Sequence, residues 1–329
     1  MTGRRRKRVV DTQASVAAQA AESTTIPQQG DGSTGVAPVV TTVPTVRAWG
    51  DDSGIEVRGL SFAYDSHPVL SNVSFRAESG QFLAVLGPNG VGKSTLFYCL
   101  LAIRSPDQGQ VLLDGRSIHD MAPAKVARRV AYVPQSHAPT FNYSVEDMVL
   151  MGTTARVGGF TGPGADELAQ AREAMERVGI SHLAQRGYMQ ISGGERQLAL
   201  IARALAQQAR VVVMDEPTAN LDYGNQLRVL ARVKDLSSQG YTVIVSTHNP
   251  DHVFLFADRV LALKDGRVVA DGSPGDCLTA DLIEDLYGVR VRLRRSEDGH
   301  VSCEPLLTHV GTAMMDDTTD IPCHKERDT

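Results

Sequence analysis

The chain has 329 residues, of which 42% are hydrophobic and 22% are charged, a balance typical of globular proteins. With a net charge of −5 and only 5% aromatic residues, the composition argues against nucleic acid as a partner. No apolar run reaches the roughly 18–20 residues that a membrane span needs. The four cysteines form no C-x-x-C pair, which predicts free thiols in a reducing compartment: Cys99, Cys277, Cys303 and Cys323.

Residues 1–50 are rich in small and polar residues without a sustained period, and we predict a disordered tail. The basic run at residues 4–8 could contact anionic lipid or nucleic acid, but we favour a solvated part of the tail. No apolar segment follows it, so it lacks the pattern of a secretory signal and we expect a cytoplasmic protein. Residues 296–329 are again polar, and we predict an irregular C-terminal tail.

Residues 51–295 between these tails are patterned and predict one domain. Residues 55–64 and 70–77 alternate apolar and polar side chains, as half-buried antiparallel strands do. Further strands are predicted at 81–87, 110–115, 130–134, 210–217 and 241–248, and helices at 93–103, 122–129, 166–180 and 225–240. This alternation predicts an α/β fold with a parallel sheet, an antiparallel β subdomain, and an inserted helical subdomain at about residues 136–208.

A glycine-rich loop, GPNGVGKS at residues 87–94, fits the phosphate-loop pattern G-x-x-x-x-G-K-[ST] at every fixed position. Its glycines let backbone N–H groups surround phosphate oxygens. Lys93 would supply a cation to the β and γ phosphates, and the Ser94 hydroxyl would coordinate Mg²⁺. Because the loop follows a buried strand and opens a helix, we assign nucleotide binding to Gly87, Pro88, Asn89, Gly90, Val91, Gly92, Lys93, Ser94 and Thr95.

Acidic and polar residues follow three of the other predicted strands, at the sheet edge where α/β proteins bind ligands. Asp215 would hold Mg²⁺, mostly through water, and Glu216 would orient and deprotonate the attacking water. His248 could hydrogen-bond the γ-phosphate and bridge to the catalytic carboxylate. Gln135 could reach Mg²⁺ and the water through its amide oxygen.

A second predicted anion site, Ser192-Gly193-Gly194, lies directly ahead of a helix. Free backbone N–H groups and the positive end of the helix dipole favour phosphate there.

Together these motifs resemble the ATP-binding-cassette (ABC) family of ATPases over about residues 55–295. In chain order they are Tyr64, GPNGVGKST, Gln135, ISGGE, VVVMDEP, NLD at 220–222, and His248. The resemblance implies a P-loop NTPase of ABC type that hydrolyses ATP with Mg²⁺ and works as a head-to-tail homodimer.

In such a dimer, Ser192, Gly193 and Gly194 of one chain close over the γ-phosphate that the other chain binds. The resemblance also implies that Tyr64 stacks on adenine and that Asp222 acts across the interface. The chain departs from the commonest family pattern at Ile191, Glu195 and Asn220. A carboxylate at Glu195 puts a direct ATP contact by that side chain in question.

Longer stretches, such as TANLDYGNQLRVL and LYGVRVRL, look like ATPases of iron-siderophore, haem and cobalamin importers. This implies a peripheral subunit on the cytoplasmic face of the cell membrane, working with permease subunits and an extracytoplasmic substrate-binding protein. By resemblance, residues 135–159 would meet the permease.

Other cargoes (molybdate, zinc or manganese) stay open, as do two classes of ABC ATPase that do not transport. One is a soluble ATPase of translation or DNA maintenance, but the chain carries a single cassette with only about 120 residues between Lys93 and Asp215. The other is a non-hydrolysing regulatory cassette, which the presence of Glu216 and His248 disfavours.

Overall fold

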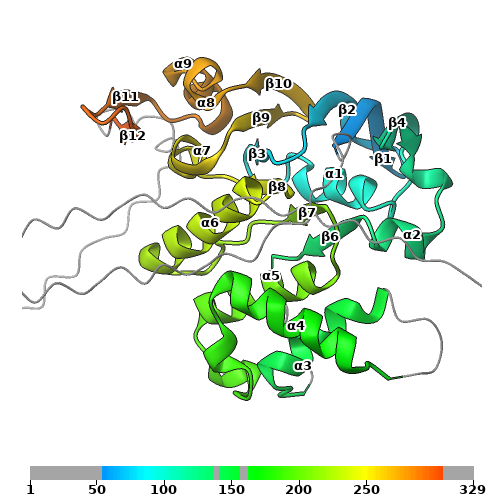
Figure 1. Cartoon of the computed structure of the whole chain (residues 1–329). Coiled ribbons are helices and arrows are strands. Elements are labelled where there is room, and N and C mark those ends of the chain that lie inside the picture. The colour runs from blue at the N-terminus through cyan, green and yellow to red at the C-terminus, as the bar shows by residue number, and fades with distance from the viewer. Residues whose placement is uncertain (1–53, 136–140, 156–161, 307–329) are drawn as a thin grey trace, which may run out of the picture. The chain divides into compact units, whose positions relative to one another are not determined.

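The two amphipathic segments at the start of the patterned region form the antiparallel strands β1 (Ile55–Tyr64) and β2 (His67–Ala77). They belong to a four-stranded sheet in the order β2-β1-β4-β5, completed by β4 (Gln108–Leu113) and β5 (Arg116–Ser117). The structure, a computed structural model, describes residues 54–135, 141–155 and 162–306 (Figure 1). The predicted tail at residues 1–50 therefore lies outside the described residues.

A six-stranded sheet carries the short apolar strands in the order β10-β9-β3-β8-β7-β6. Its members are β3 (Phe82–Leu86), β6 (Val130–Val133), β7 (Val211–Met214), β8 (Thr242–Thr247), β9 (Arg259–Lys264) and β10 (Arg267–Gly272). All neighbouring pairs are parallel except β10 with β9. The carboxyl ends of β3, β8, β7 and β6 consequently meet at one edge.

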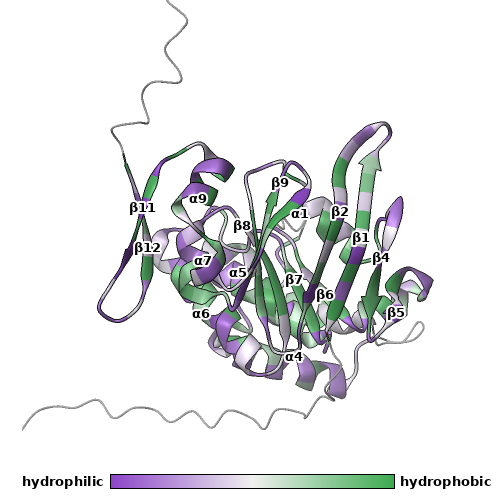
Figure 2. Cartoon of the chain, turned by 90° about the horizontal axis from the view of Figure 1, so that it is seen from above, coloured by the Kyte–Doolittle hydropathy of each residue, from purple (hydrophilic) through white to green (hydrophobic). Residues whose placement is uncertain are grey.

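The inner strands of this sheet bury alternate side chains in two different cores, because successive residues of a strand point to opposite faces. Leu83 and Val85 of β3 join the core shared with β1, β2, β4 and helix α1 (Lys93–Leu100). Phe82 and Leu86 join the core shared with α5 (Gly193–Ala206), α6 (Tyr223–Ser238) and α7 (Pro250–Phe256). In Figure 2 the inner strand β7 is accordingly hydrophobic, and β8 carries a hydrophobic centre between Thr242 and Ser246.

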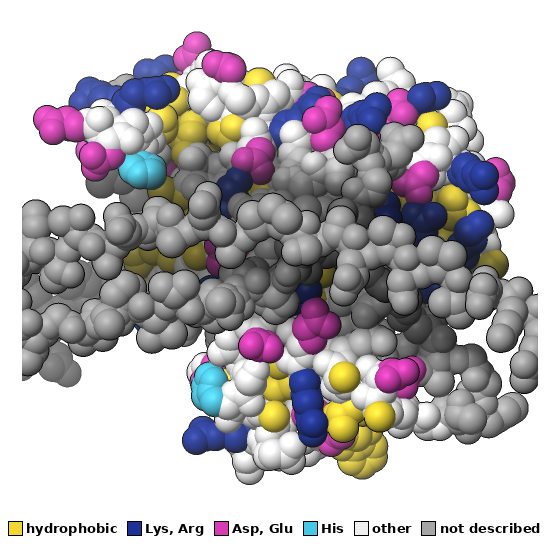
Figure 3. All heavy atoms as spheres, in the orientation of Figure 1, with side chains coloured by type: hydrophobic (Ala, Val, Ile, Leu, Met, Phe, Trp, Pro, Cys, Tyr) yellow, Lys and Arg dark blue, Asp and Glu magenta, His cyan; other side chains and the backbone are white. Residues whose placement is uncertain are grey.

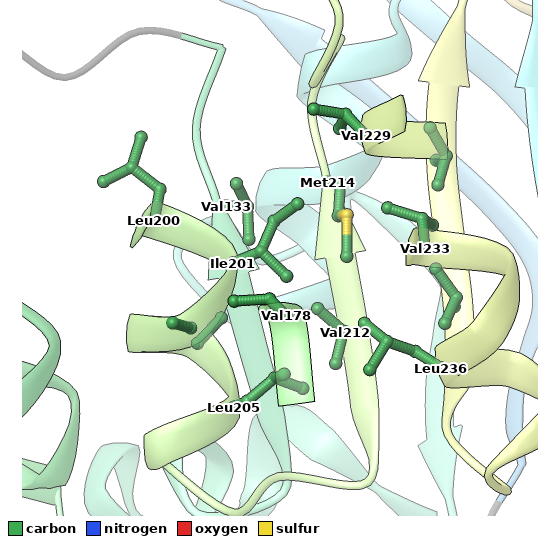
Figure 4. Packing of buried hydrophobic residues seen from close by; sticks show 14 of the residues in the cluster. Val133, Val178, Leu200, Ile201, Leu205, Val212, Met214, Val229, Val233 and Leu236 are labelled. Carbon is green, nitrogen blue, oxygen red and sulfur yellow. The ribbon is translucent and has the colours of Figure 1, made fainter. Parts of the chain in front are cut away.

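The second core is drawn in Figure 4, where side chains from two helices converge on β7. Ile201 and Leu205 reach β7 from α5, and Val233 and Leu236 reach it from α6. This packing fixes α5, and with it the Ser192-Gly193-Gly194 segment, against one face of the sheet.

The chain between β6 and β7 folds into helices, as predicted, within its described residues. Helices α3 (Val145–Leu150), α4 (Ala165–Val178) and α5 pack on one another below the sheet in Figure 1. Short 3-10 turns lie between them at Met151–Ala155, Ser181–Leu183 and Tyr188–Gln190. With the antiparallel sheet and the parallel sheet, this block confirms the predicted α/β fold class.

The first core is completed by η1 (Ile118–Asp120) and α2 (Pro123–Ala127), and the C-terminal region by α8 (Pro274–Cys277) and α9 (Ala280–Tyr287). After α9 come β11 (Val291–Arg295) and β12 (Val301–Pro305), which pair as an antiparallel hairpin. The prediction of an irregular tail from residue 296 was therefore wrong over β12. The alternation in VSCEP, residues 301–305, is too short to predict a strand by itself. A contact from a distant part of the chain also holds the strand, because the Cys303 N–H donates a hydrogen bond to Asp251 Oδ1 of α7 at 2.8 Å. Residues 307–329 lie outside the described residues.

Cys99, Cys277 and Cys303 are free thiols, and Cys323 lies outside the described residues. Within the described part of the chain, no helix has both the length and the apolar character that crossing a bilayer requires. On the face drawn in Figure 3, the visible basic and acidic side chains are interspersed.

Candidate functional site

The phosphate loop joins β3 to α1, as the sequence predicts. Gly92 is the N-cap of α1 with a left-handed φ of 105°, and a Cβ there would lie 2.9 Å from Leu70 Cδ2. Only glycine fits both constraints. The Lys93 ammonium donates hydrogen bonds to the carbonyls of Gly87 (2.8 Å) and Pro88 (3.0 Å), and its side chain is only 6% exposed. Burial lowers the pKa of Lys93, and the nearby Glu216 carboxylate opposes this shift.

The Glu216 carboxylate lies within contact distance of three other predicted site residues. Its Oε1 lies 3.4 Å from Lys93 Nζ, and its Oε2 lies 3.4 Å from His248 Nδ1. Gln135 Nε2 approaches Oε2 at the same distance of 3.4 Å. The residue has a left-handed φ of 42°, unusual for a side chain of this size and a form of strain that is concentrated at functional sites. Four strand ends thus bring these groups around one carboxylate.

Asp215, the residue before it, is buried and held by a residue that sequence reasoning missed. Ser246 Oγ donates to Asp215 Oδ1 at 2.7 Å and accepts from the Glu216 N–H at 2.8 Å. One hydroxyl therefore orients both acidic residues. The signal in the sequence was a serine inside the apolar strand VIVST, where a polar side chain needs a partner.

A cleft of about 480 Å³ opens over the phosphate loop. Its lining brings together most of the predicted residues: Tyr64, Asn89, Gly90, Gly92, Lys93, Ser94, Thr95, Gln135, Asp215 and Glu216, with Val69 in addition. Tyr64 is 40% exposed, packs edge-on against Phe62, and lies 5.8 Å below the Arg104 guanidinium. Val69 and Arg104 were not predicted, since neither belongs to a recognisable motif.

Ser192, Gly193 and Gly194 are absent from the lining of this cleft. Ser192 is the N-cap of α5, and its Oγ accepts the Glu195 N–H at 3.3 Å. Glu195 Oε2 accepts the Ser192 N–H at 2.7 Å in return, which completes a capping box. This hydrogen bond holds the pKa of Glu195 below its usual value. The departure from the commonest family pattern at Glu195 thus has a local structural role.

Asp222 is likewise a helix cap, at the start of α6. Its Oδ1 accepts the Asn225 N–H at 2.9 Å, and this contact lowers the pKa of Asp222. A Cβ on Gly194 would lie 2.8 Å from the Asn225 side chain, so α5 and α6 begin side by side. The Ser192-Gly193-Gly194 segment thus lies beside the start of α6, and it is separate from the phosphate loop, whose cleft it does not line.

The residues that line the cleft fit the requirements of a Mg²⁺ site. Within the described residues, no three His, Cys, Asp or Glu side chains are grouped as metal ligands. The cleft instead offers oxygen atoms from Asp215, Ser94 and Gln135. Mg²⁺ is typically held by one or two carboxylates together with water and substrate phosphates, and these donors fit that pattern.

Comparisons with known proteins agree with this geometry. The family model described as ABC transporter matches residues 70–219. An uncharacterized ABC transporter ATP-binding protein of Haemophilus influenzae is 40% identical over 233 residues, which cover 71% of this chain and 89% of that protein. The ferric enterobactin transport ATP-binding protein FepC of Escherichia coli is 34% identical over 263 residues, covering 79% of this chain and 96% of FepC.

Among solved structures, the chain is similar to an ABC transporter described as of metal-chelate type, in an inward-facing conformation. The TM-score is 0.69 at 33% identity, and the match covers 77% of this chain and 98% of the solved one. With the phosphate loop, the acidic strand end and the capped Ser-Gly-Gly segment in place, the chain belongs to the ABC transporter family as an ATP-binding subunit with ATPase activity.

Proposed function

We propose that Glu216 is the general base of ATP hydrolysis in this chain. The observation that carries this proposal is the convergence of Lys93, Gln135 and His248 on its carboxylate, at 3.4 Å each. A carboxylate so surrounded is placed to receive a proton from water that attacks the γ-phosphate. His248 and Gln135 then orient the carboxylate and sense the γ-phosphate.

We further propose that ATP occupies the cleft over the phosphate loop with Mg²⁺ bound beside it. Backbone N–H groups of residues 87–95 and the Lys93 ammonium would hold the phosphates, and Tyr64 would contact the adenine. Ser94, Gln135 and Asp215 would hold Mg²⁺, which neutralises charge on the phosphate oxygens when bound. The Ser246 hydroxyl supports this assignment because it keeps the Asp215 carboxylate fixed.

We propose that the catalytic site is completed by a second copy of this chain. Ser192, Gly193 and Gly194 do not line the cleft that Lys93 lines, although their exposed helix start suits a phosphate. A head-to-tail homodimer would place them opposite the γ-phosphate of the partner. Asp222, which caps the adjoining helix, would lie at the same interface.

Ser192→Arg should abolish turnover while leaving ATP binding by the single chain unchanged within about twofold, because the large cation blocks only the partner's site. Steady-state hydrolysis and calorimetric ATP titration measure the two effects. Ser273→Arg is the matched control, since Ser273 is also an exposed helix N-cap, and it should keep turnover. Persisting hydrolysis in Ser192→Arg would refute the composite site.

A groove of about 800 Å³ between α2, β6 and the helical block supports docking on a membrane permease. Its lining includes Ile103, Met121, Val126, Met151 and Leu200. We propose that a permease segment inserts here, with Gln135 linking the groove to the nucleotide site. Residues 136–140 and 156–159 of the predicted docking stretch lie outside the described residues.

The proposed cargo is a metal chelate: an iron-siderophore, haem or cobalamin. Similarity to FepC and to the metal-chelate type transporter supports this class. The chain would then act at the cytoplasmic face of the membrane, with an extracytoplasmic binding protein delivering the cargo to the permease.

An affinity capture from gently solubilised membranes tests this assignment. Tagged Glu216→Gln, trapped with Mg-ATP, should bring down a polytopic permease whose identity narrows the cargo. The same chain carrying Lys93→Ala in addition is the control, and it should capture less. Ribosomes or DNA-repair proteins in place of a permease would move the chain to a class that does not transport.

A further inference from the structure

A second, smaller cavity of about 120 Å³ lies on the other side of Glu216. Of the described residues, Glu216 alone lines both this cavity and the nucleotide cleft. The other lining residues, all polar except Ala219, come from the end of β8, from the loops after β7 and β8, and from α6 and α7: Thr218, Ala219, Asn220, Gln226, Thr247, His248, Asn249 and His252. Glu216 thus lies between the nucleotide cleft and the second cavity.

His252 lies in the wall of this cavity and has no role in the mechanism above. It is on the first turn of α7 and is only 7% exposed. Its Nδ1 is buried without a hydrogen-bond partner in the described structure. An orphaned buried polar atom of this kind costs free energy, so it calls for a partner such as ordered water.

The cavity can supply that water. Its volume exceeds the roughly 10–15 Å³ that one water molecule requires, and its walls carry several hydroxyl and amide groups. Burial lowers the pKa of His252, with Asp251 opposing and His248 reinforcing the shift. A neutral ring presents one donor and one acceptor nitrogen, which suits a water molecule in either orientation.

Hydrogen-bond partners on the side of the second cavity would help to hold the Glu216 carboxylate in place. Its three polar neighbours lie at 3.4 Å, longer than good hydrogen bonds of this type. Lys93 would also be drawn to the phosphates when ATP binds, which removes one of the three. Water in the second cavity can reach the carboxylate from behind without competing with the nucleotide.

We propose that His252 is a positioning residue that anchors ordered water behind Glu216, and that this water holds the carboxylate in its catalytic orientation. The inference rests on the proposed role of Glu216 as the base.

The test compares His252→Leu with His252→Asn in the full-length chain. Leucine fills similar space without a polar atom, whereas asparagine keeps one near the Nδ1 position. His252→Leu should lower kcat about five- to tenfold, the effect of about one lost hydrogen bond, with the ATP dissociation constant unchanged within about twofold. His252→Asn should recover most of kcat. High-resolution crystal structures should show the water in the wild type and lose it in the leucine variant.

Val253→Ala is the matched control, because Val253 neighbours His252 on α7 but packs into the core. It should lower the melting temperature without lowering kcat of the folded protein. Should His252→Leu fail to fold, His252→Gln replaces it, since the glutamine amide reaches the Nε2 position and should restore less kcat than asparagine. A leucine variant that folds and keeps wild-type kcat overturns the inference, as does an equal loss of kcat in the leucine and asparagine variants. Glu216→Gln, assayed in the same experiment, distinguishes failure of the proposed general base from failure of the proposed role of His252. If Glu216→Gln keeps its ATPase activity, Glu216 is not the base, regardless of the result for the His252 variants.

Discussion

Glu216→Gln should reduce steady-state ATP hydrolysis by about a thousandfold while ATP binding persists, because an amide cannot accept the proton that a general base must take. Glutamine has nearly the same shape, so it can still meet Gln135 and His248 at the ends of β6 and β8. Unhydrolysed ATP should then hold two chains together. Hydrolysis assays and size-exclusion chromatography with light scattering, each with Mg-ATP, measure the loss of turnover and the stable dimer.

Glu195→Gln is the matched control for this prediction, since it makes the same chemical change in the same chain. Glu195 works in the structure as an acceptor for the Ser192 N–H, and glutamine completes a capping box as well as glutamate does. This variant should keep turnover within about threefold. Steady hydrolysis by Glu216→Gln at the wild-type rate would mean that another group takes the proton.

Lys93→Ala should weaken ATP binding by about a hundredfold, the effect of losing two charge-assisted contacts to phosphate. The ammonium is enclosed by the carbonyls of Gly87 and Pro88 and lies 3.4 Å from Glu216 Oε1, so no other cation can take its place easily. Its removal also leaves the half-buried Glu216 carboxylate facing the γ-phosphate without the neighbouring ammonium. Isothermal titration calorimetry with Mg-ATP measures the affinity directly.

The control for this second prediction is Lys125→Ala, which removes an exposed lysine from α2. It should bind ATP as the wild type does. If Lys93→Ala retained wild-type affinity, the phosphates would have to bind elsewhere, and the cleft over the phosphate loop would lose its assignment.

Much of the fold and of the nucleotide site could be predicted from the sequence because the decisive signals are local. The phosphate loop is one strand, one turn and one helix start, and its glycines are required by backbone geometry, as at Gly92 with φ of 105°. The capping box of Ser192 and Glu195 is equally local, and although we did not predict it from the sequence, the S-x-x-E spacing was the signal that could have revealed it. The alternation of β1 and β2 and the apolar runs of β7 and β8 reveal their burial in the same way.

Other features depend on how distant segments pack. Gln135 and His248 reach Glu216 only because β6 and β8 flank β7, and the order β10-β9-β3-β8-β7-β6 cannot be read along the chain. The same packing places Ser246 between Asp215 and Glu216. Strand β12 exists because it pairs with β11 and is held by Asp251 of α7, and its own five residues carry too little pattern to predict it.

The sequence by itself therefore determined which chemical groups the protein has and which turns present them, because backbone conformation and capping depend on neighbours in the chain. Only the tertiary structure decided that Glu216 is where these groups meet, that the Ser-Gly-Gly segment lies apart from the cleft of its own chain, and that His252 lines a cavity behind the carboxylate. Strand order and helix packing set the positions of these residues relative to one another. Both depend on contacts between residues far apart in sequence, which local patterns do not reveal.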